Sequence, residues 1–413
     1  MPEDGGNFIT DWLWGLLTGL GLSEGLTLLI LTFLGVLVLA TVILLTAILL
    51  VWLERKLAAR IQDRVGPNRV GPFGLLQPVA DIVKLLIKED ITPEGADKVI
   101  YNFAPILVTG SVLLLWAVIP FAPQIIGADI NVGVLYIVAI GGLTTLGIIM
   151  AGWSSNNKYA LLGAFRSVAQ LISYEVPLIL VLLVPVLLAR SMGMNSIVES
   201  QSVWFGIMSP LALAIFLVAS IAEIGRTPFD LLEAESEIVA GYHIEYSGMK
   251  FGLFLAAELI HALLISALTA TLFLGGWRGP YADTVPFLGA VYFILKTALV
   301  YFVVVWVRGT LPRVRIDHML NFNWKMLTPL ALVLLIATAV ADKLLEGNSA
   351  WLRAGVHLGI SIVLILALVQ IIRVYSQGVR RRQPVAVPMP FAAPPPPLPP
   401  LETAPEPVAP PAS

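Results

Sequence analysis

The chain has 413 residues, of which 58% are hydrophobic and 13% are charged, and its formal net charge is -2. Soluble globular domains carry about 25% charged residues, so this composition excludes that class and indicates a membrane protein. The near-neutral charge gives no support for a nucleic-acid partner. Because the sequence lacks cysteine and its four histidines show no metal-ligand spacing, we expect no metal, flavin or iron–sulfur cluster to be bound by this chain alone.

Long apolar tracts follow one another along the sequence. Each is long enough to cross a hydrocarbon core of about 30 Å as a helix, and lipid satisfies no exposed backbone hydrogen bonds. The sequence therefore predicts an all-α polytopic membrane protein with about nine transmembrane helices, at residues 27–53, 103–121, 133–152, 161–189, 208–225, 250–275, 286–308, 325–342 and 355–374.

The remaining segments complete the predicted organisation. Residues 1–26 form an external N-terminal segment, residues 27–378 a transmembrane helical domain, and residues 379–413 a basic and then Pro-rich tail that we expect to be disordered. The largest loop, residues 54–102, contains an amphipathic surface helix on the cytoplasmic side. One of its faces is apolar, with Leu75, Leu76, Val79, Ile82, Val83 and Leu86.

Lysine and arginine are distributed unevenly between the two predicted sides of the membrane. Most of the 25 lie in one alternating set of loops and ends, while the other set holds Arg190, Arg278, Lys343 and Arg353. Positive charge marks the cytoplasmic side. We therefore predict that the N-terminus lies outside and the C-terminal tail in the cytoplasm.

Acidic residues inside predicted spans are the most informative feature. Glu175 lies in the middle of one span, and Glu258 lies about two turns into another with His261 one turn further on. A charged side chain at the centre of a membrane helix costs about 2.5 to 3.5 kcal/mol, so such residues are functional by default. The alternative is a carboxyl group that stays protonated and bonds a neighbouring carbonyl. Glu258 and His261 form either a proton-exchanging pair or a simple hydrogen bond.

A strongly acidic loop occupies residues 226–250. Thr227, Pro228 and Asp230 predict the start of a helix, and Gly241 predicts its end. Asp230, Glu233 and Glu237 then share one face, where like charges titrate as a coupled group. Such a group can take up and release protons, whereas the plainer interpretation is a solvated acidic loop.

The loop at residues 54–72 combines repeated arginines with dense glycine and proline. Glycine and proline indicate a fixed, folded path, but a purely structural turn does not require the arginines. We expect an anionic or polar partner for this loop.

Five segments resemble the H subunit of NADH-quinone oxidoreductase, the quinone-channel membrane subunit of bacterial complex I. They are the loop at 54–78, Gly152-Trp153 with residues 158–164, Ile172-Ser173-Tyr174-Glu175, the acidic residues 223–248, and Arg308 to Arg313. The resemblance extends over about residues 27–342. It implies a multi-pass protein of the bacterial plasma membrane that works with other membrane and peripheral subunits, including those of the quinone site and the terminal iron–sulfur cluster, and with lipid.

The resemblance also implies roles for individual residues, with quinone as the substrate. The residues that line or support the quinone tunnel are Arg55, Asp81, Lys84 and Arg313, with Arg308 and Arg315 close by. Arg226 and Tyr246 match residues beside the proton path. The acids that connect the quinone site to proton pumping are Glu54, Glu175, Glu223, Asp230, Glu233, Glu235, Glu237 and Glu258.

Three functions remain in competition at this point. The leading hypothesis is a subunit without its own redox centre that couples quinone reduction to proton translocation in a proton-pumping NADH-quinone oxidoreductase. A membrane subunit of a related ferredoxin- or hydrogenase-linked complex, including a pure anchor for a peripheral arm, is the first alternative. An ion transporter that acts alone is the second, because buried acids serve such proteins equally well.

Overall fold

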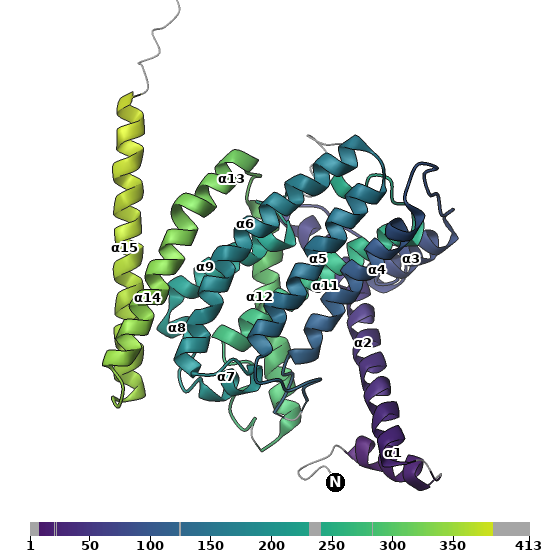
Figure 1. The fold of residues 1–413 in the computed structure, drawn as a ribbon, viewed down its shortest axis with the longest axis horizontal. Coiled ribbons are helices and arrows are strands. Elements are labelled where there is room, and N and C mark those ends of the chain that lie inside the picture. The colour runs from purple at the N-terminus through teal and green to yellow at the C-terminus, as the bar shows by residue number, and fades with distance from the viewer. Residues whose placement is uncertain are drawn as a thin grey trace, which may run out of the picture. The chain divides into compact units, whose positions relative to one another are not determined.

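The computed structural model describes residues 8–19, 21, 23–123, 125–230, 241–282 and 284–382. Over these residues the chain is built from helices and loops, with one isolated β-bridge between Ala122 and Ile125. The predictions for Glu233, Glu235, Glu237 and the Pro-rich tail from residue 383 fall outside the described residues. The longer helices (Figure 1) are α1 (Phe8–Gly19), α2 (Glu24–Ile61), α3 (Gln77–Ile87), α4 (Lys98–Leu115), α5 (Gly133–Ser154), α6 (Lys158–Ala189), α9 (Pro210–Ile224), α11 (Gly248–Phe273), α12 (Pro286–Thr310), α14 (Thr328–Leu344) and α15 (Ala350–Arg382).

Shorter helical segments connect the long ones. Most of them fall in the turns between spans, and one is a π-helical turn between α13 and α14. They are η1 (Pro72–Gly74), η2 (Trp116–Val118), α7 (Met194–Ser200), α8 (Phe205–Met208), η3 (Gly241–His243), α13 (Ile316–Phe322) and η4 (Asn323–Leu327).

Eight helices in the described part of the chain are long and apolar enough to cross a membrane. They coincide with eight of the predicted spans, which confirms the prediction of an all-α polytopic membrane protein. The remaining predicted span, residues 208–225, corresponds to α9, which has 15 residues. At about 1.5 Å per residue α9 is about 22 Å long, less than the hydrocarbon thickness, so at least one of its ends lies within the depth of the bilayer.

The chain divides into two compact units, Met1–Ile365 and Leu366–Ser413. The first unit holds α1 to α14 and the first half of α15, and the described part of the second is the remainder of α15. All of the residues discussed below lie in the first unit.

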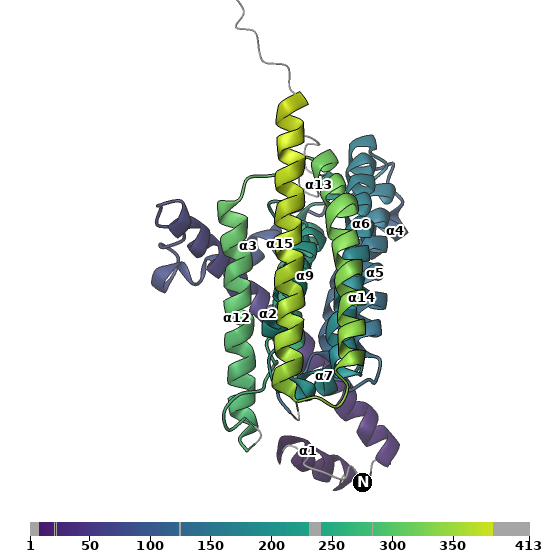
Figure 2. The same ribbon diagram turned by 90° about the vertical axis from the view of Figure 1, so that its left-hand side faces the viewer.

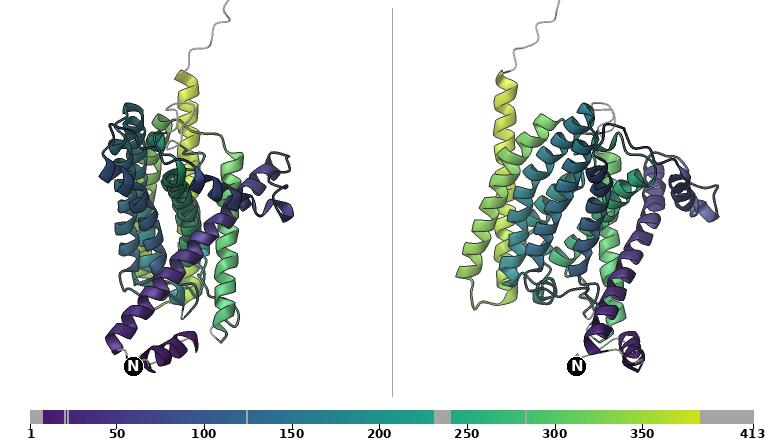
Figure 3. Two further views of the ribbon diagram at one scale, coloured as in Figure 1. Left: turned by 90° about the vertical axis from the view of Figure 1, so that its right-hand side faces the viewer. Right: turned by 45° about the vertical axis from the view of Figure 1, so that its right-hand side comes forward.

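Within the first unit, α4, α5, α6 and α9 pack side by side, as Figures 1 and 2 show, and α11 packs against α4, α9, α12 and α2. Small residues allow close approach of these helices, which is the usual basis of helix packing in membranes. Gly152 of α5 is an example, because a Cβ atom there would lie 2.3 Å from the Cβ of Ala164 on α6. Helix α2 crosses the others at an angle, as Figure 3 shows, and its N-terminal half is mostly exposed.

The first loop is shorter than we predicted. Helix α2 continues to Ile61, so Glu54, Arg55 and Lys56 belong to its last turns rather than to the loop. Glu, Arg, Lys, Leu and Ala dominate this stretch, and all of them are favourable in helices. At the other end of the loop α4 begins at Lys98, because the side chain of Asp97 caps it by accepting from the backbone N–H groups of Val99 and Ile100.

The helix that we expected to begin at Thr227 does not begin there, because residues 226–230 form turns and bends. Backbone carbonyl groups that would accept hydrogen bonds within a helix accept them here from donors that are distant in the sequence. The carbonyl of Pro228 accepts from the N–H of Val314 at 3.0 Å, and that of Phe229 accepts from the side chain of Gln170 at 2.8 Å. The continuation, residues 231–240, lies outside the described part of the chain.

The predicted surface helix corresponds to α3. Its apolar residues are exposed, with Val79, Val83 and Leu86 each more than a third accessible. An exposed apolar stripe on a short helix is the pattern of a helix that lies along a membrane surface.

Candidate functional site

A buried ion-paired group lies where α2, α9, α11 and α12 meet. We call it the buried cluster, and it consists of Glu54, Arg226, Glu258, Tyr301 and Arg308. The carboxylate of Glu54 accepts from the guanidinium of Arg226, from the hydroxyl of Tyr301 at 2.6 Å and from the guanidinium of Arg308 at 2.7 Å. Three donors from two other parts of the chain therefore hold this one carboxylate in place.

Arg226 is the centre of the buried cluster. Only 2% of its side chain is exposed, and its Nε lies 2.9 Å from Oε1 of Glu258, so one guanidinium joins the carboxylates of α2 and α11. Burial alone would lower the pKa of Arg226, but the charges of Glu258 and Glu54 raise it above its ordinary value. The arginine therefore carries a fixed positive charge between two acids.

The backbone that holds Arg226 is fixed from two directions. Helix α9 ends at Gly225, whose φ of +73° is the left-handed conformation that glycine adopts without strain. The side chain of Gln170 on α6 donates to the carbonyls of Ala222 at 2.6 Å and Phe229 at 2.8 Å, on either side of Arg226. This buried amide therefore ties α6 to the short end of α9.

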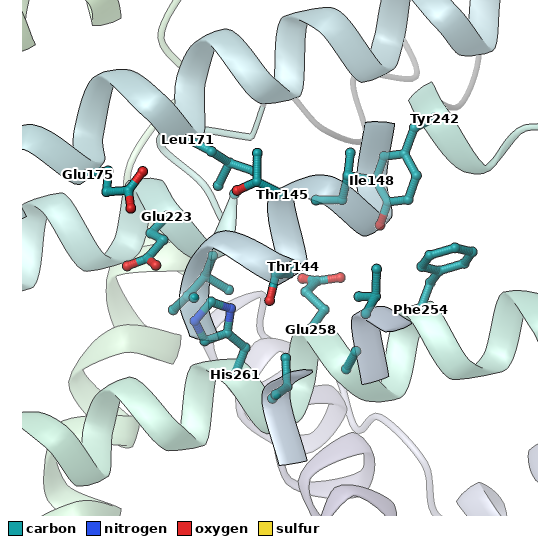
Figure 4. A pocket seen from close by; sticks show the side chains of 16 residues that line it. Thr144, Thr145, Ile148, Leu171, Glu175, Glu223, Tyr242, Phe254, Glu258 and His261 are labelled. Atoms are coloured by element: carbon teal, nitrogen blue, oxygen red, sulfur yellow. The ribbon is translucent and has the colours of Figure 1, made fainter. Parts of the chain in front are cut away.

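A cavity opens beside the buried cluster between α4, α5, α6, α9 and α11. Its volume is about 60 Å³, and Figure 4 shows its polar lining of Thr144, Thr145, Glu175, Glu223, Tyr242, Glu258 and His261. Glu175 and Glu223 point toward each other across it, from α6 and α9. A second cavity of about 30 Å³ shares Glu175, Glu223, His261 and Gly141 with the first, and its other lining is mainly apolar.

The cavity walls carry acids but no lysine or arginine among the described residues. Two facing carboxyl groups in a low-dielectric interior repel when both are charged, so protonation of one is coupled to protonation of the other. Glu258 pairs with Arg226 rather than with His261, although both line the cavity. Glu258 thereby connects the buried cluster to the pair of facing acids.

A second ion-paired group lies at the surface, between the end of α2 and α3. We call it the surface cluster, and it consists of Arg55, Gln77, Asp81 and Lys84. Asp81 accepts from Arg55 and from Gln77, and lies 3.7 Å from the ammonium of Lys84. Partial burial would raise the pKa of Asp81, but the hydrogen bond and charge of Arg55, with the charge of Lys84, hold it below the usual value. A surface hollow beside this cluster is lined by Arg55, Arg64, Gly66, Pro67 and Gln77.

The remaining predicted site residues lie in other segments. Arg313 and Arg315 lie in the linker between α12 and α13, which bonds to residues 226–230 through Val314. Asp230 is half-buried at the end of the described segment. Tyr246 lies against α4, where its ring stacks on Tyr101 with the centroids 4.1 Å apart.

Sequence reasoning missed Tyr301, which donates to Glu54. The signal was present, because Tyr301 and Arg308 are seven residues apart on one helix and so share a face. Both of them meet Glu54. In this chain, a tyrosine two turns before an arginine near the end of a span therefore marks the face that meets a buried carboxylate.

Long apolar helices surround an ion-paired arginine and several carboxyl groups. This arrangement defines the class of the protein, a polytopic membrane protein with buried ionisable residues. Such groups mark proteins that move protons or ions, or that respond to charge within the membrane.

Comparison with known proteins identifies the family. A family model described as NADH dehydrogenase matches residues 34–339. The NADH-quinone oxidoreductase H subunit of Dehalococcoides mccartyi (strain CBDB1) is 49% identical over 324 residues, which cover 78% of this chain and 90% of that protein. The corresponding protein of Geobacillus kaustophilus (strain HTA426) is 52% identical over 289 residues, covering 70% and 86%. That of Brevibacillus brevis (strain 47 / JCM 6285 / NBRC 100599) is 48% identical over 311 residues, covering 73% and 92%. The chain therefore belongs to the family of NADH-quinone oxidoreductase H subunits.

Proposed function

We propose that the chain is the membrane subunit of a proton-translocating NADH-quinone oxidoreductase that couples quinone reduction to proton movement. One observation carries the proposal: ionisable side chains continue from the surface cluster, through the buried cluster, to the facing acids of the cavity. Glu54 and Arg55 are neighbours on α2, and each belongs to a different cluster. A change of charge at the surface therefore acts on the buried acids over a short distance and through a poorly screening medium.

In this proposal the quinone lies on the α2 and α3 side of the chain. Arg55, Asp81 and Lys84 supply charged hydrogen-bonding groups beside a surface hollow, next to the exposed apolar residues of α3 that suit an isoprenoid chain. Arg313 and Arg315 contribute positive charge from the linker after α12. Reduction of a quinone takes up protons and alters the charge in its surroundings, and the surface cluster is placed to respond.

The buried acids then form the coupling route. Glu54, Glu258, Glu223 and Glu175 come from four different helices, and Asp230 lies at the edge of the same region. Glu54 and Glu258 are ion-paired with Arg226, whereas Glu175 and Glu223 face each other across the cavity, so the facing pair is the part that exchanges protons in this proposal. The acids Glu233, Glu235 and Glu237 would continue the route beyond the described residues.

We also propose that the chain lies in the bacterial plasma membrane with its N-terminus outside and its C-terminal tail in the cytoplasm, bound to the membrane and peripheral subunits of the complex. The ion pairs of Arg190 with Asp342 at 3.4 Å and of Arg353 with Asp342 support this orientation. They bring the ends of α6 and α14 and the start of α15 to one side, which the charge distribution marks as the outer side. A C-terminal reporter that is active only outside the cell would contradict the orientation.

The substitution Glu175→Gln in the assembled complex tests the proposal. It keeps the shape of the side chain but removes the titrating proton, so we expect the rate of quinone reduction coupled to proton pumping to fall by about tenfold or more. Glu199→Gln on α7 is the matched control, since Glu199 is exposed and far along the chain from the cavity residues. Normal activity and pumping in the Glu175 variant would remove this residue from the route.

A further inference from the structure

Helix α6 contains a proline two residues beyond Glu175. Pro177 has no N–H, so the carbonyl of Ser173, four residues earlier, lacks its helical donor. In the structure this carbonyl accepts a hydrogen bond from the side-chain amide of Asn323, which is fully buried. The donor therefore comes from a different part of the chain, the π-helical turn η4 between α13 and α14.

The capped carbonyl and the proline bracket Glu175 on both sides. The residue between Ser173 and Glu175 is held as well, because the hydroxyl of Tyr174 donates to the carbonyl of Met319 on α13 at 3.2 Å. Glu175 itself points the other way, into the cavity and toward Glu223 (Figure 4). The α13 and η4 region thus fixes the backbone of α6 from behind, at the point where α6 presents its acid.

The same arrangement occurs at a second proline. Pro105 in α4 leaves the carbonyl of Tyr101 without a helical donor, and the hydroxyl of Tyr246 donates to that carbonyl at 3.1 Å. Tyr246 follows η3, the first described segment after residues 231–240. Two prolines within predicted spans therefore have their free carbonyls bound by side chains from distant segments.

We infer that Asn323 is a positioning residue for Glu175, holding the interrupted backbone of α6 so that the Glu175 carboxyl faces Glu223. This inference rests on the proposed function for its consequence in the complex. An unpaired carbonyl inside a membrane protein is unfavourable, so without Asn323 the helix shifts until residue 173 finds another partner. A small displacement at Ser173 moves Glu175 directly, since the two residues are separated by a single residue.

A pair of substitutions isolates this role. Asn323→Leu removes the donor, whereas Pro177→Ala returns a backbone N–H to residue 177, which can then serve the Ser173 carbonyl within α6. In the assembled complex we expect Asn323→Leu to lower quinone reduction by about three- to tenfold and to shift its pH profile, and Pro177→Ala in the same chain to restore both. Asn321→Leu is the matched control, because Asn321 is exposed and its amide donates to the backbone carbonyl of Asp317 within the same helix, α13.

A second readout does not depend on activity. A hydrophobic carbodiimide labels carboxyl groups inside membrane proteins, and mass spectrometry of the complex gives the labelling rate at Glu175. We expect this rate to change in Asn323→Leu and to return in the double variant, even if Glu175 proves to have no part in proton transfer. If Asn323→Leu leaves activity and labelling unchanged, or if Pro177→Ala fails to restore them, the inference is wrong. Assembly of the complex is judged in the same way. If Asn323→Leu prevents assembly and the added Pro177→Ala restores it, the positioning role is supported. If the complex is lost in both the single and the double variant, the role is contradicted.

Discussion

The buried cluster and the surface cluster are built from the same chemical groups in different surroundings. In the first, the side chains of Arg226 and Glu54 are 2% and 9% exposed, and in the second those of Arg55 and Asp81 are 46% and 22% exposed. Water reaches the Arg55 and Asp81 pair much more readily than the Arg226 and Glu54 pair, so it can replace a lost partner more easily in the surface cluster. The ion pair of Arg226 with Glu54 therefore holds the helices in place, whereas Arg55 can exchange its partner Asp81 for an arriving ligand.

The largest effect is expected from Arg226→Met, which removes the shared partner of two buried carboxylates. Breaking a buried pair from one side leaves an uncompensated charge and costs about 3 to 5 kcal/mol. We expect little assembled complex, measured by the amount of the chain in purified membranes. Adding Glu54→Gln and Glu258→Gln in the same chain should recover part of it, because the two carboxylate charges that lost Arg226 are then removed, and Arg308, which also loses Glu54, is 41% exposed. Full assembly of Arg226→Met alone would show that the buried cluster is solvated after all.

An intermediate effect is expected at His243. This side chain is buried and has no ionic partner among the described residues, so it reports the effect of burial without that of an ion pair. Burial lowers the pKa of His243 to about 4 from its ordinary 6.5. The unfolded chain binds a proton below pH 6.5, but the folded chain does not until about pH 4. Stability from this group is complete above pH 6.5 and declines as the pH falls, by up to about 1.4 kcal/mol per pH unit.

The control for His243 is His243→Phe, which keeps a ring against Tyr242 and Phe251 but cannot titrate. Thermal unfolding midpoints of the purified complex between pH 7 and pH 5 give the measurement. The difference between the two proteins should grow toward pH 5. Equal pH dependence would mean that His243 is open to water in the complex.

The smallest effect on stability is expected from Arg55→Ala, at about 0 to 1 kcal/mol, since the pair is exposed and screened. Quinone kinetics should change more than stability, with a higher KM for a water-soluble quinone. The pKa of Asp81 lies below its ordinary value, so the pair persists down to about pH 3.8 and weakens only under more acidic conditions. A loss of assembly as large as that of Arg226→Met would remove the distinction between the clusters.

The sequence predicted the helices that depend on local composition. Long tracts without charge and the apolar stripe of α3 were sufficient for eight spans and the surface helix, because lipid leaves the backbone no alternative. It did not predict that α2 extends to Ile61 or that residues 226–230 are irregular. The extension of α2 follows helix-favouring residues that lie beyond the apolar tract, so hydropathy did not reveal it. The irregular 226–230 backbone depends on distant partners, namely Gln170 and Val314.

The candidate site was also predicted only in part, because some of its residues are evident from local sequence and others only from their distant partners. Acids that interrupt apolar tracts, such as Glu175 and Glu258, stand out without any knowledge of the fold. The role of Tyr301 does not, since a tyrosine in a span is ordinary until its partner is known. Spacing alone also suggested His261 as the partner of Glu258, whereas the stronger charge of Arg226 reaches Glu258 from another segment.

Glu54 and Arg55 also determine how α2 is turned about its own axis. The preceding thirty residues, from Glu24 to Leu53, carry no charge after the first, and those that are buried include Ile43, Ala47 and Leu50. Two adjacent side chains about 100° apart, each bound to a different segment, add specific polar contacts to this apolar packing. The dipeptide therefore helps to set the rotation of α2 about its axis, and with it the face that this apolar helix exposes to lipid.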